Sequence, residues 1–380
     1  MDWWGVIVGA VVGVLVDRLF GEVLERKGRR WLRRRRNSRT DREWANSDLN
    51  SVALEVVQTG WSSDGSFGPE AVTVLLGDDD FEAPSAIAWL REVHRQEWVD
   101  AGHHDGVQVG IRSLQIQRMS DEPADLRDGR SHVINIVAQR YRYFDFLATH
   151  VALLRGTTDE KKVLTPFLPN TPRPRPIDGF PNPLSVGLSL LCEDGDALVL
   201  TTRGTEVSAG GWWHGGATFN AVGEGCAPKD FRASSADGSL RCTPSDTARR
   251  GLYEELGLSD HDVNEGRLMI HTLAWAPDLL DLKFLGAFAT PITFSELSHR
   301  YASAPDRTEH EGLQRIDVST GAACRALVAR MREEPEAWSP EATTCTLRTL
   351  LVLGRIGPGA LRGGNGRTVR SGTRPSQGPE

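Results

Sequence analysis

The stretch TPSDTARRGLYEELGL, residues 243–258, decides how this chain is interpreted. It predicts one helix that begins after a threonine cap, with Pro244 at the first helical position and Asp246 at the spacing of a capping box. Gly257 is placed to end the helix in the left-handed conformation. Both ends of the helix are therefore specified by local signals.

The same helix ends in a pair of glutamates. Residues three and four apart share a helix face, so Gly251, Glu254 and Glu255 are expected to lie together. Two adjacent carboxylates can hold a hard divalent cation such as Mg²⁺. A lone pair of glutamates more often forms a solvated acidic turn, because charged side chains usually face water.

The segment resembles the second half of the Nudix box, whose pattern is G-x5-E-x7-R-E-U-x-E-E-x-G-U, with U a bulky aliphatic residue. Six residues stand on its positions in register: Arg250, Leu252, Glu254, Glu255, Gly257 and Leu258. Two positions depart, because Gly251 replaces the first helix glutamate and Cys242 the upstream one. The resemblance implies an α+β protein with a Nudix-type α/β/α sandwich and a mixed sheet.

Flanking segments extend the resemblance to roughly residues 180–355. Residues 184–202 predict two apolar strands around an acidic glycine turn. The segment WWHGGATFNAVGEG (212–225) resembles the approach to the family's glycine loop, and residues 226–241 resemble an insertion rich in turn formers. Residues 282–294 predict a later strand, and 306–318 resemble the family's late acidic segment.

As the family does, the chain would bind a nucleoside diphosphate linked to another moiety, with Mg²⁺ or Mn²⁺ as cofactor. The implied metal ligands are Glu254, Glu255 and either Glu309 or Glu311. The implied catalytic residues are Arg250, Glu254 and Glu255, and the implied substrate-binding residues are Arg203, Trp213, Gly223 and Gly225. The alternative for Arg250 is a purely structural role, as an ion pair with Glu254 within the helix.

Three functions stay open. In a hydrolase, water would be activated by a residue other than Gly251, such as His214, Glu224 or a late glutamate. In a catalytically inactive nucleotide sensor, the two remaining box glutamates would support binding without turnover. In a scaffold, the box helix would be only structural.

The N-terminus carries the apolar run WWGVIVGAVVGVLV, residues 3–16, followed by six arginines between positions 29 and 36. The run predicts a single-pass signal anchor in the cell membrane, with the C-terminal body in the cytoplasm by the positive-inside rule. Gly5, Gly9 and Gly13 share one face and suit close helix packing in a homo-oligomer. The arginines suit an anionic lipid surface. The alternatives are an interfacial or buried helix, since the run is short for a span, and a secretory signal peptide.

Composition bounds the remaining choices. The net charge is −7 although arginines gather near the N-terminus, so the body is acidic and we expect no nucleic-acid partner. The five cysteines follow no CxxC spacing, which indicates neither a disulfide framework nor a zinc site. Cys242 is interpreted as a passive substitution, with a reactive thiol as the alternative.

The chain is divided by these signals into six parts. Residues 46–165 predict strands at 71–76, 107–119 and from 132 onward and a helix at 84–102, either as a small α+β domain or as an extension of the Nudix-like sheet. The expected parts are a membrane-anchor helix at 1–22, a basic link at 23–45, this N-terminal α+β region, a Pro-rich linker or strap at 166–183, a Nudix-like domain at 184–355 that ends in helices, and a disordered tail at 356–380.

Overall fold

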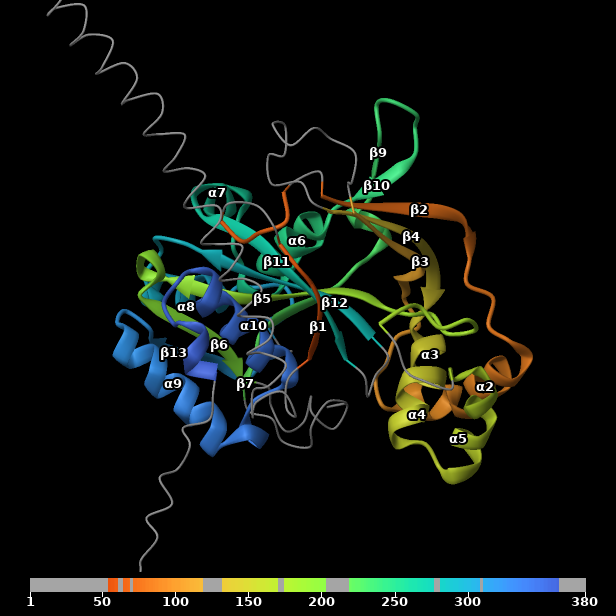
Figure 1. Cartoon of the computed structure of the whole chain (residues 1–380). Helices are drawn as coiled ribbons and strands as arrows, with labels where there is room; N and C mark the ends of the chain where they lie inside the picture. Colours follow the sequence, from red (N-terminus) through yellow and green to blue (C-terminus); the bar gives the residue numbers. More distant parts are fainter. Residues whose placement is uncertain are drawn as a thin grey trace, which may run out of the picture.

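The computed structural model describes residues 54–60, 64–68, 71–118, 132–169, 174–202, 219–276, 281–307 and 310–361. This part is an α+β protein with two mixed sheets (Figure 1). The expected anchor at 1–22, with its glycine face, and the basic link at 23–45 lie outside the described residues. Within the described ranges, no helix is long and apolar enough to cross a membrane.

The larger sheet has the strand order β1-β11-β12-β5-β6-β13, with β7 beside β6 and β8 beside β5. The predicted hairpin is confirmed, because β5 and β6 pair antiparallel around a turn at Glu193–Gly195. The one parallel contact between the named strands of this sheet joins β5 to β12. The strands are β1 (Glu55–Thr59), β5 (Leu184–Cys192), β6 (Ala197–Thr202), β7 (Phe219–Asn220), β8 (Val222–Gly225), β11 (Arg267–Ala276), β12 (Asp281–Ala289) and β13 (Gly312–Asp317).

The second sheet has the order β3-β4-β2-β10-β9. The predicted strands of the N-terminal region form β2 (Val72–Asp80), β3 (Val107–Arg118) and β4 (His132–Arg142). The segment expected to be only a turn-rich insertion supplies the other two strands, β9 (Arg232–Ala233) and β10 (Leu240–Cys242), and Cys242 pairs with Val74. Strands of two or three residues carry too little alternation to be recognised from sequence.

Helices cover both faces of the larger sheet (Figure 1). The predicted box helix is α6 (Pro244–Leu256), which contacts β5, β8 and β11. The predicted C-terminal helices are α9 (Gly321–Glu333) and α10 (Pro340–Val352), and α10 contacts β5, β11 and β12. Neighbouring strand residues point to opposite faces. A Cβ at Gly223 would meet α10 at Glu341, whereas the side chain of Glu224 lies against α6 at Gly251, so the two helices lie on opposite faces.

The remaining helices lie around these sheets. The short helices α7 and α8 pack near α6, and the predicted helix at 84–102 is confirmed as α2, which packs with α3 and α5 beside the second sheet. The bounds are α2 (Ser85–Asp100), α3 (Tyr143–Phe146), α4 (Ala152–Arg155), α5 (Thr158–Leu164), α7 (Asp260–Glu265) and α8 (Phe294–Tyr301).

One hydrophobic cluster runs through both sheets, with Ile134 from the second sheet and Phe284 from the larger one. The Pro-rich segment is a strap that belongs to this core, because Ile177 and Phe180 are buried in it. Asn182 holds the strap in shape, since its amide bonds the backbone of Ile177 and Phe180. The strap therefore contributes to the hydrophobic cluster that also contains residues of both sheets.

Candidate functional site

The box helix has the predicted ends. The Asp246 carboxylate accepts hydrogen bonds from the Thr243 amide at 2.8 Å and from its hydroxyl at 2.7 Å. Gly257 adopts a φ of 69°, and a Cβ there would stand 2.6 Å from the Arg300 carbonyl oxygen. Only glycine combines this left-handed conformation with such a close approach. The helix is thus held in place at both ends.

Arg250 is the centre of a charged network on the α6 face. Its Nε lies 2.6 Å from Asp230 Oδ1, and one terminal nitrogen lies 2.8 Å from Glu224 Oε1 and 2.7 Å from Glu254 Oε2. The predicted pair with Glu254 is therefore present. Although burial opposes protonation, Asp230 and Glu224 raise the pKa of Arg250. The guanidinium is bound by the protein's own carboxylates.

Asp230 is a residue that the sequence interpretation missed. It is buried in the short 3₁₀ turn Pro228–Asp230, where it also accepts a hydrogen bond from the Thr247 hydroxyl at 2.9 Å. The β9–β10 hairpin separates it from α6 in the sequence. A carboxylate does reach Arg250 from upstream, but from Asp230 and not from the position of Cys242.

The two box glutamates have different partners. Glu254 Oε1 lies 2.5 Å from Lys229 Nζ, and its other oxygen bonds Arg250. Burial favours the neutral carboxyl, but Lys229 and Arg250 outweigh it and lower the pKa of Glu254. Glu255 is buried, with Oε2 at 2.8 Å from His310 Nε2. The adjacent carboxylates thus point to separate partners.

Protein cations occupy one of the expected metal ligands. Both oxygens of Glu254 contact protein cations. Glu311 is exposed at the edge of β13, and Glu309 lies outside the described residues. In the described part of the chain, no group of three or more His, Cys, Asp or Glu side chains is placed to hold a metal ion.

Glu224 occupies the space that a side chain at position 251 would take. A Cβ built on Gly251 would stand 2.8 Å from Glu224 Cβ and 3.8 Å from its Oε2. Burial raises the pKa of Glu224 to about 7, and repulsion from Glu255 raises it further. Arg250 opposes this shift, but its charge is shared with other carboxylates. A carboxyl group thus lies over the glycine gap in the box, contributed by β8.

Cys242 belongs to the core. Its Sγ lies 3.9 Å from that of Cys226, and both residues are buried. The contact with Cys226 and burial raise the pKa of the Cys242 thiol, so the thiolate needed for reactivity is disfavoured. These features support the interpretation of a passive substitution.

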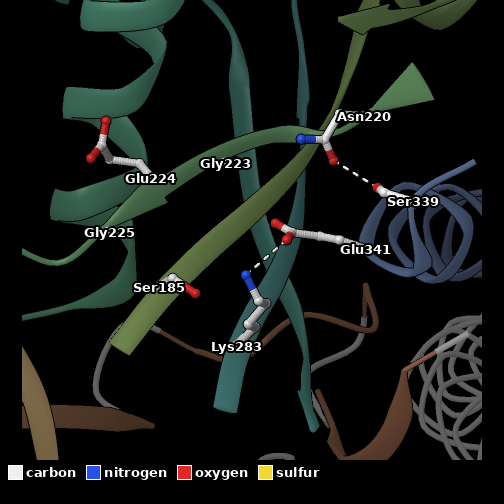
Figure 2. Close-up of a pocket in the computed structure, with 8 residues that line it drawn as sticks. All are labelled: Ser185, Asn220, Gly223, Glu224, Gly225, Lys283, Ser339 and Glu341. Carbon is white, nitrogen blue, oxygen red and sulfur yellow. Dashed lines mark hydrogen bonds and ion pairs between the residues drawn. The ribbon is translucent and has the colours of Figure 1, made fainter. Parts of the chain in front are cut away.

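A polar pocket of about 100 Å³ lies at β8, where the predicted glycines are found. Figure 2 shows Glu341 reaching towards Lys283 on one side of the strand, while Glu224 lies beside a helix on the other. The residues that line the pocket are spread between positions 185 and 341: Ser185, Asn220, Gly223, Glu224, Gly225, Lys283, Ser339 and Glu341. The predicted substrate contacts Arg203 and Trp213, and the alternative base His214, lie outside the described residues.

The pocket contains a buried ion pair that the sequence analysis did not identify. Lys283 Nζ lies 2.9 Å from Glu341 Oε2 and 3.5 Å from Asp281 Oδ2. The two partners stand 58 positions apart in the sequence. No local motif joins them, so only the fold reveals the pair.

No family model matches the sequence, and no curated protein gives a match. We therefore infer a function from the residues and geometry described above.

Proposed function

We propose that residues 184–355 form a Nudix-like domain that binds a small nucleotide-type ligand and does not hydrolyse it through a divalent cation. The order of elements supports the likeness: an apolar hairpin, a glycine-containing strand and a capped helix with Arg250, Glu254 and Glu255. The observation that carries the proposal is the pairing of both Glu254 oxygens with Lys229 and Arg250.

The ion pairs take the place of a metal in balancing charge. A divalent cation at Glu254 would have to displace Lys229 and weaken the bond to Arg250. Weakening the largely buried pair of Glu254 and Arg250 is unfavourable, because the Arg250 charge loses one of its partners. Ligand binding requires fewer precisely placed groups than turnover, so a binding or sensing role suits this box.

A hydrolase is the second candidate, and the position of Glu224 favours it. Its carboxyl lies over Gly251, and its pKa of about 7 suits a general base near neutral pH. In this hydrolase, Glu224 would be the general base in place of the glutamate that Gly251 replaces.

We also propose that the domain is held at an anionic membrane by residues 1–22 and the arginines that follow, with the domain in the cytoplasm. The basis is the uncharged run of residues 3–16 beside the basic link. Fractionation of cells tests this part, because recovery of the full-length protein in the soluble fraction after lysis contradicts it.

The test of the function uses the purified full-length chain and a panel of nucleoside-diphosphate-linked compounds. We expect calorimetry to detect binding that persists in EDTA, and chromatography to detect no products with Mg²⁺ or Mn²⁺. Turnover that disappears in Glu224→Gln would establish the hydrolase instead. Absence of both binding and turnover would contradict both candidates.

A further inference from the structure

The pocket on the α10 face is formed around one carboxylate. Glu341 lies in the first turn of α10, where the helix dipole favours a negative charge. Ser339 caps this helix by accepting from the Ala342 amide at 3.0 Å, and its hydroxyl contacts Asn220 Oδ1 at 2.7 Å. The helix start is thereby fixed against β7, and the carboxylate is directed onto the sheet.

Two glycines make room for this carboxylate. A Cβ at Gly187 would stand 2.2 Å from Glu341 Oε1, and a Cβ at Gly223 would stand 3.2 Å from it. Gly187 is on β5 and Gly223 on β8, which pair with each other at these residues. Neighbouring strands thus both lack a side chain at the point where Oε1 enters.

The carboxylate has one oxygen in use and one available. Oε2 bonds Lys283 at 2.9 Å, whereas Oε1 is buried and has no hydrogen-bond partner among the described residues. Glu341 is 8% exposed, so this oxygen receives little from bulk water. The Ser185 hydroxyl also lines the pocket, and it too is buried without a hydrogen-bond partner among the described residues. Buried polar atoms of this kind call for a partner.

The pocket also has access to solvent and a limited size. Ser185, Asn220 and residues 223–225 are partly exposed, so the lining reaches the surface. An apolar cavity of about 150 Å³ can hold benzene. The present volume of about 100 Å³ therefore suits the edge of one ring and not a whole nucleotide.

The pocket presents a buried acceptor. Glu341 Oε1 has no hydrogen-bond partner among the described residues, whereas the neighbouring Lys283 ammonium is already engaged by Glu341 and Asp281. We propose that this pocket binds the edge of a planar ring that carries an N–H donor, as in an oxo-nucleobase. Glu341 Oε1 accepts from the ring N–H. The nucleobase class rests on the proposed function, whereas the edge chemistry rests on the pocket alone.

The experiment uses the full-length chain with uridine and inosine as probes. Each is compared by calorimetry with its derivative methylated on the ring nitrogen that carries the N–H. We expect at least about tenfold weaker binding after methylation, because the hydrogen bond to a charged acceptor is lost. Equal binding of a nucleoside and its methylated form would overturn the proposal, as would absence of binding by both nucleosides.

Two variants locate the effect. Glu341→Gln and Gly223→Ala are each expected to weaken uridine binding at least about tenfold, the first by removing the charge and the second by placing a methyl against Oε1. Glu296→Gln is the matched control, since Glu296 also lies in the first turn of a helix, α8, but is not in the pocket lining. Circular dichroism checks that each variant is folded.

Unchanged uridine binding by folded Glu341→Gln and Gly223→Ala would refute the pocket assignment. The proposed function fails by different results: the formation of products with Mg²⁺ or Mn²⁺, or the absence of both binding and turnover for the nucleoside-diphosphate-linked compounds. The two failures are therefore distinguishable.

Discussion

The α6 and α10 faces of the larger sheet both hold a largely buried cation among carboxylates, but the cation has different partners on each face. On the α6 face, Arg250 bonds Asp230, Glu224 and Glu254 with its forked donors. On the α10 face, Lys283 contacts Glu341 and Asp281, and an oxygen of Glu341 is left over beside a pocket. Similar charges thus form an internal support on one face and a candidate ligand site on the other.

The largest effect is expected from breaking the α10 cluster. Lys283→Met leaves two buried carboxylates without their cation, which should lower the free energy of unfolding by about 3–5 kcal/mol. Urea denaturation measures the change. The double variant Lys283→Met/Glu341→Gln should recover part of the loss, and a single-variant loss below about 1 kcal/mol would show that the cluster is not a tightly paired one.

Glu224 should make the α6 face sensitive to pH. Its pKa is raised from 4.5 to about 7 in the folded protein, so the folded state holds this proton more tightly than the unfolded state does. The contribution to stability is present below pH 4.5 and is lost as pH rises through 7, with a magnitude of about 3 kcal/mol. Denaturation from pH 4.5 to 8 should show this decline in the wild type and a flatter profile in Glu224→Gln. Parallel profiles would contradict the raised pKa.

The forked geometry of Arg250 can be tested without removing its charge. Lysine cannot reproduce the simultaneous bonds to Asp230 and Glu224, so Arg250→Lys should cost about 2 kcal/mol in urea denaturation. Arg315→Lys is the matched control, because Arg315 pairs with Glu193 at the surface. A similar small change in both variants would argue against a supporting role for Arg250.

The smallest effect is expected at Lys229. Its side chain is 59% exposed, so Lys229→Met should change the free energy of unfolding by less than about 1 kcal/mol. The informative readout is thermal unfolding with and without Mn²⁺. The wild type should not respond, and a response confined to the variant would show that Lys229 keeps cations from Glu254. Stabilisation of the wild type by Mn²⁺ would contradict the metal-free interpretation.

Local signals predicted what depends on neighbouring residues. The box helix, its glycine end and the 184–202 hairpin were predicted because Pro244, Gly257 and the apolar runs act within a few residues. Asp230 was missed because a hairpin separates it from the helix it supports. Lys283 and Glu341 were missed because an ion pair between a strand and a distant helix has no spacing rule.

The glycines illustrate the same limit. Gly223 was predicted as a substrate-binding residue near the family's glycine loop, and the structure places it on a strand where it makes room for Glu341. Gly251 was read as a lost glutamate, and only the fold shows a different glutamate above it. A glycine in a sequence indicates that space is needed, but the group that uses the space comes from elsewhere in the chain.

The β9–β10 hairpin affects how this protein folds while it is being synthesised on the ribosome. Strand β2 is made early, yet its neighbour β10 pairs with it through Arg241 and Cys242, far along the chain. During translation, that edge of β2 therefore stays open until the segment before the box helix has left the exit tunnel. An open strand edge invites pairing with other chains. The nascent N-terminal region thus depends on a later segment for its protection, which ties its safe folding to completion of the part that carries the candidate site.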